Sequence, residues 1–251
     1  MIIKENNLIK KIFSKEEDFF TEYYFYQEYK DFPFIPKLIK AEKNALYLEY
    51  INGKNLYEVG IEEQLCLAKT LAKFHNSPLT THYSELTLHH DTNLKNYIYT
   101  KDKVYMIDFS DISIGHPLSD VYSALLFFAE LHPPEIFQDF HKRFLEIYFC
   151  GVHISICPPH VACGVGGEGG GIVKSSELPH HRSAELRSAC VCGREGIDNS
   201  ELRTPNSEFT TDILEKEIKR FEDRREKYGK YIMNYQYYLK NRKTLRDIHQ
   251  T

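Results

Sequence analysis

The sequence predicts an α+β, two-lobed fold in which short strands come first and helices follow. Two observations carry this prediction. Short β-branched and apolar stretches, separated by turn residues, occupy much of the first fifty positions. From residue 61 onward, apolar residues recur at the three- and four-residue spacing of amphipathic helices. Strands gathered before helices are typical of α+β domains.

The first elements alternate strand and helix. Residues 7–13, NLIKKIF, form a short apolar strand, and residues 15–30 place several aromatic side chains on one helical face. Pro33 ends that helix, because proline cannot donate the next backbone hydrogen bond. Residues 37–51 then predict two strands joined by a turn at Lys43.

The remaining elements follow from periodicity alone. Apolar residues of 61–76 lie on one helical face, and Pro78 follows that helix. The later elements are expected as short strands near 97–99 and 104–107, a helix at about 118–130, and a long charged helical pattern at 211–248.

Charge and hydrophobicity narrow the classes of binding partner to be expected for this chain. The chain has 251 residues and a net charge of −4, so charge gives no reason to expect nucleic acid or an anionic membrane as partner. The first residues lack the apolar run of a signal peptide, and ALLFFA is too short to span a bilayer. A cytoplasmic protein without a membrane span is therefore expected. The sequence indicates no particular oligomeric state.

Residues 150–208 differ from the rest of the chain. No aromatic residue occurs between 151 and 208, while nine of the thirteen glycines do. A segment without large apolar anchors cannot offset the entropy of ordering, so we predict a largely disordered insertion. Its glycine pattern at 164–169 lacks the preceding strand of a phosphate loop, and its Cys and His spacings fit no usual zinc site.

The stretch HHDTNLKNYIY suggests a catalytic site, because it places Asp91 and Asn96 five positions apart. The stretch VYMIDFSD follows and carries Asp108 at the end of an apolar strand. Phosphoryl transfer needs a carboxylate that orients the attacking hydroxyl, a lysine for the phosphates and oxygen ligands for Mg²⁺. One Asp-x₄-Asn is weak evidence, but its combination with two strands and Asp-Phe favours such a site.

These motifs, together with HPLSDVYSA, resemble the catalytic core of the aminoglycoside/choline phosphotransferase family, which shares the protein-kinase-like fold. The resemblance covers roughly residues 8–130. It implies that Asp91 is the catalytic base and that Asn96 and Asp108 bind the metal. It further implies that Asp120 braces the catalytic loop from the next helix.

The resemblance also extends upstream. It implies that Lys10 in LIKKIF holds the phosphates and that Glu22 is its partner on the following helix. Lys11 is the alternative, because strand alternation points only one of the two lysines inward. The segment YLEYINGKNL is similar to the family's hinge segment, which recognises adenine. The resemblance implies that Glu49 and Ile51 make the contacts with adenine.

Three departures from the family pattern stand out. His90 precedes the catalytic Asp where small-molecule kinases often have glycine, and DFS replaces the DFG of protein kinases. Only nine residues precede Lys10, too few for two strands and a full glycine-rich loop. We therefore expect a reduced N-terminal nucleotide-binding lobe at 1–52. The other parts are a catalytic lobe at 53–149, the insertion at 150–208, and a C-terminal helical part of the catalytic lobe at 209–251.

The resulting functional hypothesis is a phosphotransferase that uses ATP and Mg²⁺ and transfers the γ-phosphate to a hydroxyl of a small molecule. Only eleven residues separate Asp108 from Asp120, which favours a small acceptor over a peptide. A protein kinase, or a kinase of a lipopolysaccharide sugar, is an alternative within the same fold. A nucleotide-binding pseudokinase is a third hypothesis, supported by the short segment that precedes Lys10 and by the insertion.

Overall fold

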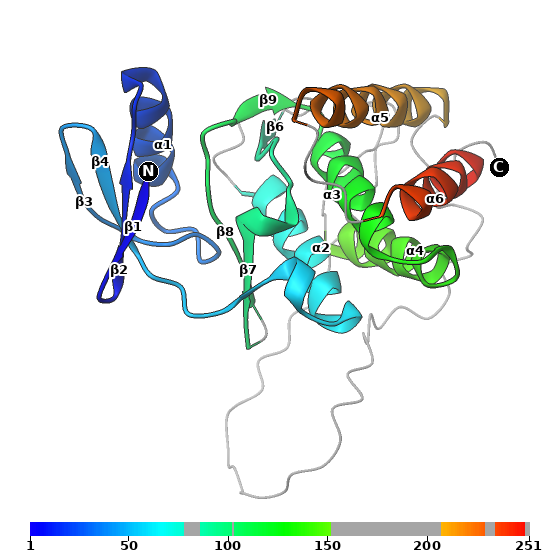
Figure 1. Cartoon of the computed structure of the whole chain (residues 1–251), viewed down its shortest axis with the longest axis horizontal. Helices are drawn as coiled ribbons and strands as arrows, with labels where there is room; N and C mark the ends of the chain where they lie inside the picture. Colours follow the sequence, from blue (N-terminus) through cyan, green and yellow to red (C-terminus); the bar gives the residue numbers. More distant parts are fainter. Residues whose placement is uncertain (78–85, 102, 152–206, 229–233, 249–251) are drawn as a thin grey trace, which may run out of the picture. The chain divides into compact units, whose positions relative to one another are not determined.

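A four-stranded antiparallel sheet forms the first part of the chain in this computed structural model (Figure 1). Helix α1 packs against β3 and β4, and the strand order is β1-β2-β4-β3. The structure describes residues 1–77, 86–101, 103–151, 207–228 and 234–248. The elements are β1 (Ile2–Glu5), β2 (Leu8–Ile12), α1 (Glu16–Glu28), β3 (Leu38–Glu42) and β4 (Ala45–Glu49).

Two tight turns set the registers of this sheet. Asn6, between β1 and β2, has a φ of 54°, and Lys43, between β3 and β4, has a φ of 42°. Asparagine tolerates this left-handed conformation better than most residues. The predicted strands, helix and Lys43 turn are confirmed, whereas β1 was not expected from the sequence.

Helices dominate the rest of the described chain, with small sheets beside them (Figure 1). The predicted helix at 211–248 is in fact two helices, and a further helix, α4, was not predicted. The helices are α2 (Ile61–His75), α3 (Leu118–Leu131), α4 (Pro134–Gly151), α5 (Ser207–Tyr228) and α6 (Tyr235–Ile248). The strands are β5 (Lys54–Asn55), β6 (Leu86–Leu88), β7 (Tyr97–Thr100), β8 (Lys103–Met106) and β9 (Ser113–Gly115).

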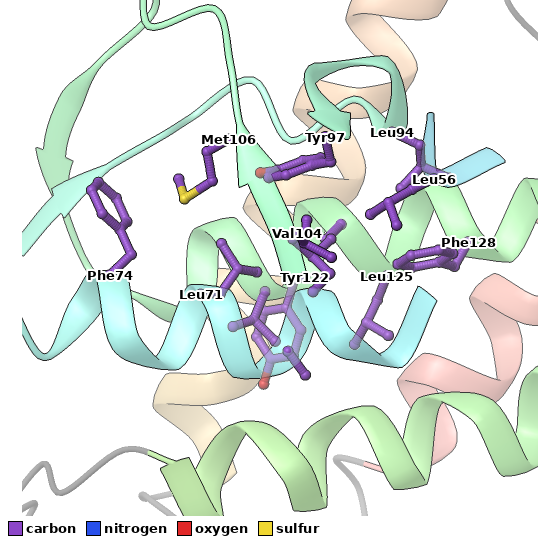
Figure 2. Close-up of a cluster of buried hydrophobic side chains, with 14 of the residues drawn as sticks. Leu56, Leu71, Phe74, Leu94, Tyr97, Val104, Met106, Tyr122, Leu125 and Phe128 are labelled. Carbon is purple, nitrogen blue, oxygen red and sulfur yellow. The ribbon is translucent and has the colours of Figure 1, made fainter. Parts of the chain in front are cut away.

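The core of this helical part lies between α2, the β7–β8 hairpin and α3 (Figure 2). Leu71 and Phe74 of α2 lie beside Val104 and Met106 of β8, and all four side chains are fully buried. Buried apolar side chains contribute about 1.5–3 kcal/mol each relative to exposure. The hairpin is therefore held firmly on α2, together with the segments that enter and leave it.

The helices on either side of residues 152–206 share one core. Phe144 and Tyr148 of α4 are buried in the same cluster as Leu214 of α5 and Tyr238 of α6. Phe149 of α4 and Tyr235 of α6, in contrast, are 41% and 45% exposed. The glycine pattern and most of the Cys and His residues of the predicted insertion lie outside the described residues. The insertion hypothesis therefore stays a prediction.

His132 is a buried histidine at the end of α3. Its Nε2 lies 2.8 Å from Gln64 Oε1, an acceptor, so Nε2 carries the proton of a neutral ring. The ring stacks on Phe128, and Asn241 of α6 donates to its backbone carbonyl at 2.8 Å. Burial lowers the pKa of His132 to about 4.

We expect this histidine to weaken the fold under mildly acidic conditions. Its pKa in the folded chain is depressed below the ordinary 6.5, so below pH 6.5 the unfolded chain binds a proton that the folded chain refuses. The free energy of unfolding should therefore fall between pH 6.5 and 4, with a slope approaching ~1.4 kcal/mol per pH unit from this group. Urea denaturation of the wild type and of His132→Gln at several pH values measures this pH dependence of the free energy of unfolding. A difference between the two proteins that does not change with pH would contradict the expectation.

Within the described residues, no helix combines the length and the hydrophobicity needed to span a lipid bilayer.

Candidate functional site

Two loops meet at the edge of the β7–β8 hairpin. Residues 89–96 lead into β7, and Asp108 follows β8. The backbone N–H of Ile107 donates to the carbonyl of Asn96 at 2.9 Å. This bond places Asp108 next to the end of the loop that carries Asp91, as the motif spacing predicts.

Asp91 and Asn96 are joined directly. The Asn96 side-chain N–H₂ donates to Asp91 Oδ2 at 2.9 Å and to the Asp91 backbone carbonyl at 3.0 Å. A 3₁₀ turn, Leu94–Asn96, is capped by Asn93, whose side chain accepts from the Lys95 N–H. Because the amide nitrogen is used by Asp91, the amide oxygen is the atom suited to a metal ion.

The lysine at this site is Lys11, so the choice of Lys10 was wrong. Lys11 Nζ bonds to Glu22 of α1 and, at 2.6 Å, to Asp108 Oδ1. Lys11 pairs across the sheet with Leu46, whereas Lys10 pairs with Tyr47 and the Lys10 Nζ lies 5.1 Å from the Tyr47 ring. Cross-strand partners share a face of the sheet, so alternation turns Lys11 toward the site and Lys10 away.

Burial and charge compete among these three groups. Burial raises the pKa of the Glu22 carboxyl to about 7, although Lys11 acts in the opposite direction. Burial also opposes the charged form of Asp108, but Lys11 and a hydrogen bond from Ser110 outweigh it and lower its pKa. The pKa of Lys11 is raised, because its two carboxylates outweigh the effect of burial. One ammonium therefore holds two carboxylates in place.

Asp120, at the start of α3, lies behind the loop. Its carboxylate is fully buried and accepts the backbone N–H groups of His89 and His90, both at 2.8 Å. His75 Nε2 lies 3.1 Å from the same carboxylate, and His75 Nδ1 lies 2.8 Å from the Tyr148 hydroxyl. Burial works against ionisation, but these bonds lower the pKa of Asp120. The geometry agrees with the predicted bracing role, and His75 links α2, α3 and α4.

Two residues of the site have left-handed backbones. His90 and Asp108 each have a φ of 64°, a conformation that glycine adopts without a steric penalty. This gives a physical reason for the glycine that the family pattern has before the catalytic Asp. In this chain the His90 ring is tied to β9, with Nδ1 2.5 Å from the Ser113 hydroxyl. Such conformations cluster at functional loops.

The predicted hinge connects β4 to β5. Glu49 ends β4, where its backbone N–H donates to Lys37 at 2.9 Å, and Ile51 is buried. A Cβ on Gly53 would lie 2.3 Å from the Tyr99 carbonyl, so only glycine fits against β7. The Ile51 side chain is thus turned to the protein interior, whereas the Glu49 side chain is half-buried.

Sequence reasoning missed two arginines of α5. Arg220 Nη2 donates to the backbone carbonyl of His90. Arg224 Nη1 lies 3.4 Å from Asp91 Oδ1, and Nη2 lies 3.4 Å from Asp111 Oδ2. Both arginines lie more than 120 residues beyond the loop in sequence, and no local motif marks these positions.

The donor set fits a magnesium ion. Mg²⁺ is usually held by one or two protein oxygens, completed by phosphate and water, and Asp108 with the Asn96 amide supplies two. No cluster of three His, Cys, Asp or Glu side chains suited to a metal occurs in the described part of the chain. A two-ligand magnesium site requires none.

Comparison with known proteins bears on the family resemblance and the fold. Residues 33–149 match the model of the phosphotransferase enzyme family, APH. A choline/ethanolamine kinase family protein from Mesorhizobium loti is similar in structure, with 11% identity and a TM-score of 0.51 over 60% of this chain and 66% of that one. A choline kinase from Cryptosporidium parvum gives 12% identity and a TM-score of 0.47 over 57% and 65%.

The match thus spans just under two thirds of these two kinase chains. Curated protein sequences give no match. The family match and the likeness to the Mesorhizobium loti structure confirm the predicted resemblance and the kinase-like α+β fold.

Proposed function

We propose that the chain transfers the γ-phosphate of ATP, with Mg²⁺, to a hydroxyl group of a small molecule. The observation that carries the proposal is the ion-paired Glu22–Lys11–Asp108 arrangement. It lies next to a carboxylate, Asp91, which is held by Asn96. These are the lysine, metal-ligand and base positions that phosphoryl transfer requires.

In this proposal Asp91 orients the acceptor. Its carboxylate accepts the hydroxyl proton as the hydroxyl oxygen forms a bond to the γ-phosphorus and the bond to the β–γ bridging oxygen breaks. Asn96 and Asp108 would hold Mg²⁺, which neutralises charge on the phosphate oxygens when bound. Lys11 positions the phosphates and is itself kept in place by the buried Glu22.

The other residues support binding and geometry. The backbone at Glu49 and Ile51 would contact adenine, in line with the resemblance. Asp120 acts as a positioning residue, because it fixes two N–H groups of the loop rather than touching a reacting atom. The short path from Asp108 to Asp120, which includes β9, supports a small acceptor, since it has little room for a peptide-binding segment.

Transfer of labelled γ-phosphate tests the proposal. The full chain is incubated with ATP and MgCl₂ and a panel of small alcohols, glycans and peptides, while thermal shift with ATP and Mg²⁺ reports binding. We expect stabilisation by the nucleotide and label on a small alcohol. Stabilisation without transfer to any acceptor would favour the pseudokinase hypothesis. Label on peptides alone would favour the protein-kinase hypothesis, and label on glycans alone would favour a kinase of a lipopolysaccharide sugar.

A further inference from the structure

Helix α5 brings two arginines, one turn apart, to the loop that carries Asp91. Arg220 is fixed: it donates to the His90 carbonyl and lies 2.9 Å from Glu217 on its own helix. Arg224 is placed differently. Its two terminal nitrogens each lie 3.4 Å from a carboxylate oxygen, one of Asp91 and one of Asp111.

The contacts of Arg224 are too long for strong ion pairs. Charge-assisted N–H···O bonds are usually about 2.7–2.9 Å long. Glu215 on the same helix forms a much shorter ion pair, because Arg246 binds it through two hydrogen bonds of 2.6 Å. The Arg224 side chain is 36% exposed. Its planar group can therefore take up a closer anion with two parallel N–H bonds.

The position of Arg224 ties it to the acceptor. In the proposed reaction Asp91 turns toward the hydroxyl, and the group that already contacts Asp91 from α5 is Arg224. A molecule whose hydroxyl meets Asp91 thus lies against this guanidinium. The two arginines also act electrostatically on the loop: burial, then Arg220 and Arg224, lower the pKa of His90, although Asp120 and Asp111 act in the opposite direction.

We infer that the acceptor is a hydroxyl compound that also carries an anionic group, a carboxylate or a phosphate ester, which Arg224 binds while Asp91 holds the hydroxyl. This inference rests on the proposed function. A quaternary ammonium alcohol such as choline would instead bring a positive charge against Arg224, which costs binding energy in a partly buried site. The α5 arginines therefore select against cationic alcohols.

Matched acceptors test the inference in the full chain. Labelled transfer is measured for choline, glycerol, D-glycerate, D-gluconate and glycerol 3-phosphate, where the carboxylates and the phosphate ester distinguish the two anions. We expect transfer to one of the anionic alcohols and a higher kcat/KM for it than for glycerol or choline. Arg224→Gln should raise the KM for that acceptor at least about tenfold, as expected for loss of a charged hydrogen bond, with the KM for ATP unchanged.

Lys219→Gln is the matched control, since it removes one positive charge from an exposed position of the same helix. Preference for a neutral or cationic alcohol, or an equal KM in wild type and Arg224→Gln, would overturn the inference.

A binding measurement separates the inference from the proposed function. Thermal shifts are recorded at constant ionic strength with malonate, with inorganic phosphate and with choline, in the presence of ADP and Mg²⁺. Both anions should stabilise the wild type and Lys219→Gln but not Arg224→Gln. Equal stabilisation of all three proteins, or none by either anion, contradicts the anionic site. Absence of transfer to every acceptor, together with a retained anion effect, would instead contradict the phosphotransferase proposal alone.

Discussion

Asp91→Asn is expected to lower kcat by about 10²–10⁴-fold, the usual contribution of a general base. The substitution keeps the size of the side chain, and the new amide oxygen can still accept from Asn96, so the loop should keep its shape. Only the negative charge that receives the hydroxyl proton is lost. The KM for ATP should change little, because Asp91 faces the acceptor. Steady-state kinetics with the acceptor found by labelled transfer measure both constants.

Asp212→Asn controls for the loss of one carboxylate, because Asp212 is exposed on α5. This control should have wild-type kinetics. If Asp91→Asn turned over as fast as the control, Asp91 would not be the base. A comparable rise in the KM for ATP would show that the loop had moved, so a nucleotide thermal shift accompanies the kinetics.

The sequence predicts well which side chains meet in the proposed catalytic loop, because these residues are close together in the chain. The loop from Asp91 to Asn96 and the hairpin to Asp108 form a continuous stretch, so spacing alone fixes which side chains meet. Asp120 follows at the start of the next helix, close enough in sequence to be placed by the same motif. The other strands and helices of the first 131 residues are likewise set by local periodicity and turn chemistry, apart from β1, β5, β6 and β9, which were not predicted.

Contacts between distant segments could not be read from the sequence. Arg220 and Arg224 reach the loop only because α5 packs on α3, and no motif within α5 records that packing. The division of the predicted 211–248 helix into α5 and α6 was missed, since charged residues continue through both helices. Exposure of Phe149 and Tyr235 also depends on how helices pack, which aromatic content alone does not show.

The choice between Lys10 and Lys11 illustrates a different limit. A strand has two faces, and two adjacent lysines fit the motif equally well until the cross-strand partners are known. In the structure the cross-strand partner of Lys11 is Leu46 and that of Lys10 is Tyr47. One residue of register thus decides which lysine reaches Glu22.

Lys11→Met should lower kcat/KM for ATP by about 10- to 100-fold, whereas Lys10→Met should change it by less than about twofold. The expected loss corresponds to one charged hydrogen bond to phosphate, roughly 1.5–3 kcal/mol. Lys10→Met is a closely matched control, because Lys10 is the same residue type, lies next to Lys11 in the same strand, and is directed to the other face of the sheet.

Lys11→Met also removes the cation shared by Glu22 and Asp108, and loss of one partner of a buried ion pair costs about 3–5 kcal/mol of folding free energy. Urea denaturation must therefore show that the variant is folded under assay conditions. A double variant, Lys11→Met with Glu22→Gln, removes the uncompensated buried charge. It should regain stability without regaining ATP turnover, because no cation is left for the phosphates. Restored turnover in the double variant, or equal losses in Lys10→Met and Lys11→Met, would show that Lys11 acts only through folding.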